Sequence, residues 1–231
     1  MKERIVGKRL VFVIILIILI VIIAKITLDN GTDASSASLN NNIIENQNMF
    51  PCEIQKGVVV ESLFQFNGTN PDSGLEGNNI AGITIINTTE KHIKNAEVTI
   101  KIKDNETLRF YLYDLPSNKS IYVFEKDNRS YELTDNILSV KGKVSFDKKE
   151  DVLLEKISFD VSETELTISN FSDENIKNLT VHCHCALDDV YFGGLTYKYP
   201  VNELNAGETV QLIAMDCYMG EAAIVRLNTE K

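Results

Sequence analysis

The N-terminal part of the chain contains one long apolar run. From Leu10 to Ala24, fifteen consecutive residues carry no charged or polar side chain. Because the side chain of Lys25 can extend towards the membrane surface, the apolar reach grows to about nineteen residues, close to the roughly twenty that span a bilayer as a helix. Residues 1–28 are therefore predicted to form a short basic start followed by one transmembrane helix.

A cleaved secretory signal is the alternative interpretation, since such signals also have a basic start and an apolar core. The small-x-small cut site of a signal is absent directly after the run, where the sequence reads Ala24-Lys25-Ile26, and Ser35-Ser36-Ala37 lies too far away. Four basic residues precede the run and only Lys25 follows it closely, which favours a cytoplasmic N-terminus. We therefore expect an uncleaved single-pass anchor in the cell membrane, with residues 29–231 outside.

Polar residues dominate the next segment. Residues 29–50 are rich in Asn, Ser, Asp and Thr, and they have no apolar period before Ile43. Such a segment cannot bury enough apolar surface to fold by itself. It is predicted to be a flexible polar stalk.

After Pro51, apolar residues alternate with polar ones at a period of two. This period, with β-branched and aromatic residues in the runs and Asn, Asp, Gly and Ser between them, predicts β-strands. Strands spaced 8 to 12 residues apart are typical of β-sandwiches, so the part after the stalk is predicted to be all-β. The alternating sets are Ile83/Ile85, Val98/Ile100/Ile102, Leu108/Phe110/Leu112, Ile121/Val123, Leu166/Ile168, Leu179/Val181, Val210/Leu212 and, with a break in the alternation, Ile224/Leu227.

The β-rich part contains an internal repeat. Residues 83–98 and 166–181 share seven identities without a gap, at an offset of 83. A further match between residues 115–121 and 204–210 raises the offset to 89. The repeat predicts two tandem β-sandwich modules, at residues 51–150 and 151–231.

Both copies contain the tripeptide Ile-Lys-Asn. Ile93 and Ile176 are expected to close one end of each core. Asn95 and Asn178 are expected to hydrogen-bond their own backbone in the turn. This structural interpretation of the tripeptide requires no ligand.

The Ile-Lys-Asn tripeptides and the stretch Asp189-Val-Tyr-Phe-Gly-Gly-Leu-Thr-Tyr197 resemble a group of membrane-anchored proteins of low-GC Gram-positive bacteria. The resemblance covers most of residues 80–231 and includes the final strand at residues 223–227. It implies a basic start, one apolar helix, a polar stalk and tandem immunoglobulin-like modules, and it implies no activity. The segment from His182 to Cys185 departs from the group, in which Tyr, Lys and Asn are expected.

The charge of the predicted outer part is strongly negative. Removing residues 1–25 takes away five basic residues and one acidic residue, which leaves 18 basic residues, 32 acidic residues and a net charge of −14. Such a surface repels phosphate backbones, so nucleic acid is excluded as a partner.

The run His182-Cys183-His184-Cys185 is the one candidate metal set, because zinc favours Cys and His ligands. On a strand, however, alternate side chains point to opposite faces. Cys183 and Cys185 are expected to point inward as small buried hydrophobic residues, and His182 and His184 outward. A disulfide from one of these cysteines to Cys217 and a weak metal site at the two histidines both stay open, and so does the redox state of Cys52.

Asp188 and Asp189, followed by Gly193 and Gly194, could be read as a calcium site, but the ligand spacing of a calcium loop is missing. A hairpin with a glycine bulge is the favoured interpretation.

No nucleophile elbow, phosphate loop or paired-carboxylate motif occurs in the sequence, so we expect no enzyme and no cofactor. The favoured function is a non-enzymatic binding or scaffold protein at the cell surface, with another envelope protein or a cell-wall polymer as partner. The alternative is a metal- or redox-handling envelope protein that uses the Cys and His residues of the second module.

Overall fold

The computed structural model describes residues 49–103, 106–132, 135–147, 155–162, 165–187, 190–217 and 221–229. The predicted anchor from Leu10 to Ala24 and almost all of the predicted stalk at 29–50 lie outside these ranges. Within them, no helix is long and apolar enough to cross a membrane.

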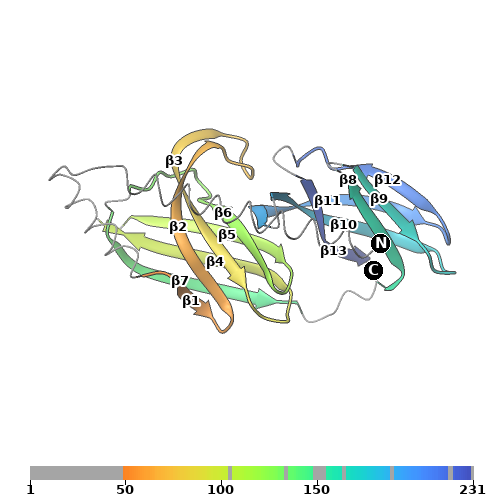
Figure 1. Ribbon diagram of the computed structural model, residues 1–231, viewed down its shortest axis with the longest axis horizontal. Helices are drawn as coiled ribbons and strands as arrows, with labels where there is room; N and C mark the ends of the chain where they lie inside the picture. The colour runs from red at the N-terminus through yellow and green to blue at the C-terminus, as the bar shows by residue number, and fades with distance from the viewer. Residues whose placement is uncertain are drawn as a thin grey trace, which may run out of the picture. The chain divides into compact units, whose positions relative to one another are not determined.

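Every regular element of the described residues is a β-strand, so the fold is all-β (Figure 1). Of the thirteen strands in the described residues, eight contain the alternating sets of the sequence, whereas the five that begin at Cys52, Val58, Ile137, Ile157 and Val190 were not identified in it. Their bounds are β1 Cys52–Gln55, β2 Val58–Thr69, β3 Glu76–Asn87, β4 Ile93–Ile102, β5 Thr107–Leu115, β6 Lys119–Phe124, β7 Ile137–Phe146, β8 Ile157–Ser162, β9 Glu165–Asn170, β10 Ile176–Leu187, β11 Val190–Leu204, β12 Thr209–Ile213 and β13 Glu221–Thr229.

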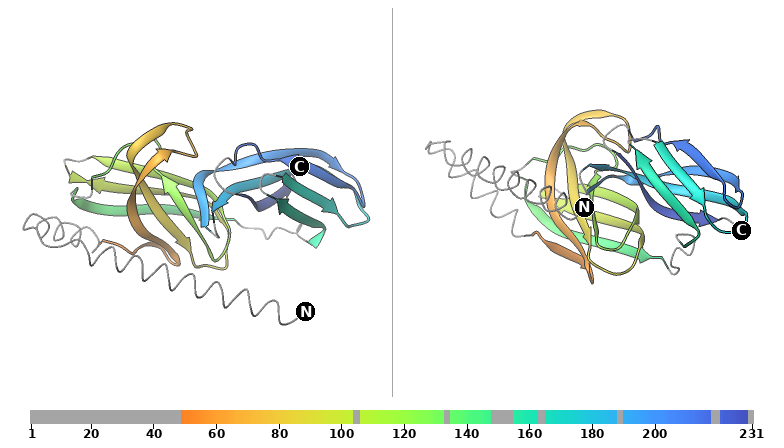
Figure 2. Two further views of the ribbon diagram at one scale, coloured as in Figure 1. Left: turned by 45° about the horizontal axis from the view of Figure 1, so that its top comes forward. Right: turned by 45° about the vertical axis from the view of Figure 1, so that its right-hand side comes forward.

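The described strands form three sheets. One has seven strands in the order β1-β2-β3-β6-β11-β10-β13, and the other two have the orders β5-β4-β7 and β12-β9-β8. The order β2-β3-β6 thus recurs as β8-β9-β12, and β5-β4-β7 recurs as β11-β10-β13. In Figures 1 and 2, the strands β1–β7 run from orange to green and β8–β13 from teal to blue.

The pairing registers repeat as well. Ile83 pairs with Val123 across β3 and β6, and Leu166 pairs with Leu212 across β9 and β12. These pairs are related by the offsets of 83 and 89 that the sequence repeat shows. The sequence repeat is therefore a repeat of strand pairing.

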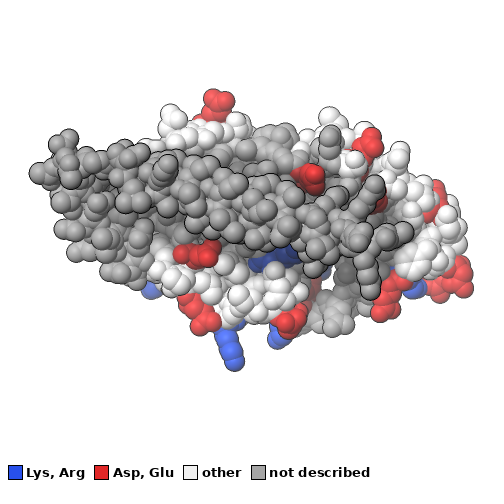
Figure 3. Space-filling view, in the orientation of Figure 1, with Lys and Arg blue, Asp and Glu red and all other residues white. Residues whose placement is uncertain are grey.

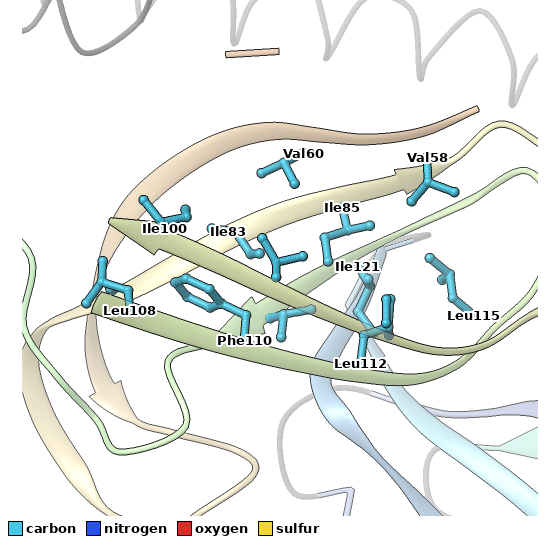
Figure 4. Packing of buried hydrophobic residues seen from close by; sticks show 14 of the residues in the cluster. Val58, Val60, Ile83, Ile85, Ile100, Leu108, Phe110, Leu112, Leu115 and Ile121 are labelled. Carbon is cyan, nitrogen blue, oxygen red and sulfur yellow. The ribbon is translucent and has the colours of Figure 1, made fainter. Parts of the chain in front are cut away.

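Two hydrophobic clusters lie between facing sheets, as in a β-sandwich. The first is built from β2, β3 and β6 on one side and β4, β5 and β7 on the other, and its side chains point into the space between the two layers (Figure 4). The second is built mainly from β8 to β13. Burial of such apolar surface at about 25 cal/mol per Å² is the main force holding each pair of sheets together.

The two halves are nevertheless joined. Strand β11 pairs in parallel with β6, through Tyr191 opposite Ile121 and Phe192 opposite Tyr122. Phe124 of β6 is buried in the second cluster, and Tyr191 of β11 in the first. The seven-stranded sheet is therefore continuous between the halves, an arrangement that the alternation of apolar residues does not indicate. The boundary predicted at residue 150 lies in residues 148–154, outside the described ranges, and stays a prediction.

Candidate functional site

An open groove with an aromatic floor lies where β2, β3 and β6 meet β11. Its volume is about 510 Å³, and it is lined by Glu61, Ser62, Phe64, Phe66, Thr84, Tyr122 and Phe192. We call it the aromatic groove. None of its residues was identified as a candidate from the sequence.

A β-bulge in strand β2 creates the groove. Val58 and Val60 point into the first core and are fully buried. The register with β3 then shifts between Val60 and Ser62, and an extra residue in one strand exchanges the two faces of the residues after it. Beyond the bulge, Leu63 packs on the first core, while Phe64 lies on the opposite face, in contact with the second.

A glycine on the neighbouring strand makes room for the first ring. Gly82 pairs directly with Phe64, and a Cβ atom at Gly82 would lie 2.4 Å from the Phe64 ring. Any side chain at position 82 would displace this ring. The ring position therefore depends on the glycine.

The aromatic rings hold one another in edge-to-face contacts. The ring centroids of Phe64 and Tyr122 are 5.5 Å apart, and those of Phe66 and Phe192 are 5.9 Å apart. Phe124, at 4.9 Å from Phe192, continues the cluster into the second core. Such contacts favour defined ring orientations, so the groove presents a preformed apolar surface.

Polar groups lie along one side of this surface. The hydroxyl groups of Ser62 and Thr84 are hydrogen-bonded to each other at 2.9 Å, and the Glu61 side chain is exposed. An apolar floor with a few fixed polar groups is the usual composition of a ligand site.

A second cluster of polar residues is buried between the two halves. It is centred on Asp114, whose carboxylate is hydrogen-bonded to His182 Nδ1 at 2.9 Å and His92 Nε2 at 3.3 Å. The guanidinium of Arg226 donates to the same carboxylate at 3.1 Å and bridges to Asp147 at 2.6 Å. Burial would raise the pKa of Asp114, but the hydrogen bonds from His182, His92 and Arg226 outweigh burial and hold the pKa well below its usual range.

His184 lies beside this cluster. Its Nε2 donates to the carbonyl of Tyr113 at 2.7 Å, and its ring stacks on Tyr191. Its buried Nδ1 has no hydrogen-bond partner among the residues that the structure describes. Burial lowers the pKa of His184 to about 4. The imidazole is therefore neutral at physiological pH, with its proton on Nε2.

The expectation that His182 and His184 face solvent is wrong. Their side chains do point to the face of β10 opposite the cysteines, but that face is covered by the end of β5, and the two residues are only 6% and 0% exposed. Among the described residues, no group of three or more His, Cys, Asp or Glu is arranged to hold a metal ion.

The cysteines of β10 lie on the inner face. Cys183 and Cys185 are buried in the second core together with Cys217, and these three and the half-buried Cys52 are free thiols.

The isoleucines of the repeated tripeptide are both in cores, Ile93 fully buried and Ile176 5% exposed. The expected role of Asn95 and Asn178 in the turn is filled by two other asparagines, Asn87 and Asn170. Asn95 is half-buried in β4, whereas Asn178 is exposed and has a φ of 53°.

Asn87 and Asn170 make matching sets of hydrogen bonds. The side-chain amide of Asn87 donates to the carbonyls of Lys91, Leu115 and Pro116. Asn170 donates in the same way, to the carbonyls of Glu174, Leu204 and Asn205. Asn87 and Asn170 are identical residues at equivalent positions of the two repeat copies. This identity was the sequence signal that could have indicated their role.

The predicted glycine-bulge hairpin is present. Leu187 pairs with Val190, and the register between β10 and β11 shifts between Cys183 and Cys185, opposite the segment that contains Gly193. Gly193 has a φ of 94°, which favours glycine. Asp188 and Asp189 lie outside the described residues.

Gly194 lies at the contact between the halves. A Cβ atom there would lie 1.9 Å from the Tyr111 carbonyl oxygen. The Asp72 carboxylate accepts hydrogen bonds from the backbone N–H groups of Gly194 at 2.8 Å and Leu195 at 3.0 Å. These contacts therefore position β11 against the first half.

Comparison with known proteins adds no family to these observations: no protein-family model matches the sequence, and a search of curated proteins found no significant match.

Proposed function

We propose that this protein is a non-enzymatic binding protein of the cell envelope, whose aromatic groove binds a glycan strand of the cell wall. In this proposal the basic start and the apolar run at residues 10–24 anchor it in the membrane. Residues 29–50 form the stalk, and two tandem immunoglobulin-like modules stand outside the cell. The recurring strand order supports the tandem arrangement, and the resemblance to membrane-anchored Gram-positive proteins supports the location.

The aromatic groove is the observation that carries the proposal. Sugar rings present apolar C–H faces, which stack on aromatic rings, and hydroxyl groups at their edges, which need hydrogen-bond partners. The rings of Phe64, Phe66 and Tyr122 offer the first kind of contact, and the Ser62 and Thr84 hydroxyls and the Glu61 carboxylate offer the second. An open groove also suits an extended polymer better than a small molecule, which needs an enclosing pocket.

The charge of the protein narrows the choice of polymer. Acidic side chains are spread over the described part of the face seen in Figure 3, with few basic ones among them. Together with the net charge of −14 after residue 25, they would repel phosphate-rich wall polymers. A neutral or amino-sugar glycan avoids this repulsion.

Sedimentation with insoluble peptidoglycan tests the proposal. We expect purified wild-type protein to sediment with the glycan, and the Phe64→Ser variant to bind at least about tenfold more weakly, as expected for losing about 1.4 kcal/mol or more of binding free energy. Phe171→Ser is the matched control, because Phe171 is 61% exposed and does not line the groove. Equal binding by the two variants, or no binding by the wild type, would contradict the proposal.

A further inference from the structure

Three of the four cysteines gather in the second core. Cys183 and Cys185 are on β10, and Cys217 is in the turn that follows β12. Their side chains are at most 1% exposed. The glycan-binding proposal uses none of them.

The contacts distinguish one pair among the three. The Cys185 thiol donates to the carbonyl of Asp216, the residue before Cys217, at 3.8 Å, and Cys185 and Cys217 are both buried in the second cluster. The turn itself is closed by a hydrogen bond from Cys217 N to Ala214 O at 3.2 Å.

Cys183 is less well placed to join either neighbour. Cys183 and Cys185 are two residues apart on one strand, so their Cα atoms are roughly 6.5 to 7 Å apart, at or beyond the upper end of the usual disulfide range. The thiol hydrogen bond that reaches Asp216 in the turn comes from Cys185. The geometry thus selects Cys185 as the partner of Cys217.

We propose that Cys185 and Cys217 form an intramolecular disulfide when the chain folds in the presence of a disulfide oxidant. One cysteine attacks the oxidant as a thiolate to give a mixed disulfide, and the second displaces the oxidant's remaining sulfur. Two protein thiols lose two electrons and two protons, and one molecule of a small disulfide such as oxidised glutathione becomes two thiols. Cys183 and Cys52 stay reduced.

The burial of the thiols determines when this reaction can occur. The thiolate is the reactive form of cysteine. Burial raises the pKa of Cys183 to about 12, and the neighbouring Cys185 thiol together with burial raises the pKa of Cys217. Cys185 and Cys217 are also only 1% exposed, so an oxidant does not reach them in the folded core. The bond therefore forms during folding, before the core closes.

The disulfide would fasten the connection between β12 and β13 to strand β10. That connection is otherwise attached near this point by a hydrogen bond from Tyr199 Oη to the Asp216 carboxylate at 2.9 Å. The proposal goes beyond the proposed function and rests on none of the glycan argument, so the two can fail separately.

Refolding with glutathione tests the disulfide. Full-length protein is unfolded with reductant, refolded in detergent with oxidised and reduced glutathione, alkylated in denaturant and mapped by mass spectrometry. Before alkylation we expect a mass about 2 Da below that of the reduced chain. After alkylation we expect two of the four thiols to be unmodified and one linked peptide pair to join Cys185 to Cys217.

The variants Cys183→Ser and Cys185→Ser form a matched pair, since both residues lie on β10 and are buried in the second core. Cys183→Ser should keep the linked peptide and Cys185→Ser should lose it. If either variant fails to fold, the peptide map of the wild type still decides. Four alkylated thiols in the wild type, or a link from Cys183 to Cys217, would overturn the proposal.

Discussion

Acidification should weaken the fold through His184, the buried neutral imidazole beside Asp114. Its pKa is about 4 in the folded protein, against about 6.5 in an unfolded chain. Well above pH 6.5 neither state binds the proton. Between pH 6.5 and 4 the unfolded chain binds it and the folded protein does not, so stability is lost as the pH falls through this window.

The magnitude follows from the two pKa values. Between pH 7.5 and pH 4.5, the linkage relation gives a loss of about 2.5 kcal/mol in the free energy of unfolding from this one group. The physical cause is burial, which disfavours the charged imidazolium, and within the described residues Nδ1 has no hydrogen-bond partner that would stabilise its proton. A loss of this size is a large share of the stability of an ordinary domain.

Urea unfolding followed by circular dichroism at both pH values measures this loss. The variant His184→Gln keeps a donor for the Tyr113 carbonyl but cannot titrate, so its loss between the two pH values should be smaller than that of the wild type by about 2.5 kcal/mol. Carboxylates titrate in both proteins and cancel in the comparison. His92→Gln, which leaves His184 in place, should retain most of the acid sensitivity. If His184→Gln loses as much stability on acidification as the wild type, the assignment of a neutral buried His184 is refuted.

Three further predictions concern other parts of the chain. Asn87→Ala and Asn170→Ala should each lower the unfolding free energy by roughly 2 to 4 kcal/mol in urea titrations, because buried carbonyl groups lose their donors. Asn95→Ala should change it by less than about 0.5 kcal/mol, and equal costs at all three positions would contradict the assigned role. Gly82→Ala should lower the unfolding free energy by about 1 to 3 kcal/mol, because the new methyl group pushes on the Phe64 ring. In the Phe64→Ala background the same substitution should cost less, and an unchanged cost would show that the ring is not the cause. The full-length protein should keep residue 1 and stay in the membrane fraction after a high-salt wash, and recovery of a soluble form beginning near Ser38 would exclude the uncleaved anchor.

Eight of the described strands and their repetition could be predicted from the sequence, because the alternation of apolar residues records which face of a strand packs on the core. Ile83 and Leu166 occupy equivalent places in β3 and β9, as the repeat indicates. The inward direction of Cys183 and Cys185 follows from the same alternation.

The groove and the polar cluster could not be predicted in this way. A bulge at Glu61 exchanges the inward-facing and outward-facing positions of β2. No residue type between Val58 and Phe66 indicates that a bulge occurs there. The burial of His182 and His184 depends on contact with Asp114 and Tyr113, about seventy residues earlier in the chain. The alternation of residues along a strand shows which face packs on its own core. It does not show whether a distant part of the chain covers the opposite face.

The pairing of β6 with β11 has a consequence for how this repeat can evolve. Tandem units that fold alone can be gained or lost one at a time, whereas here the second unit supplies the strand that covers the open edge of β6 and the core that receives Phe124. Deleting it would leave an unpaired strand edge and an exposed aromatic face, both of which promote aggregation. We therefore expect the two copies to be inherited together, with changes at Tyr122 or Phe192 constrained by both halves.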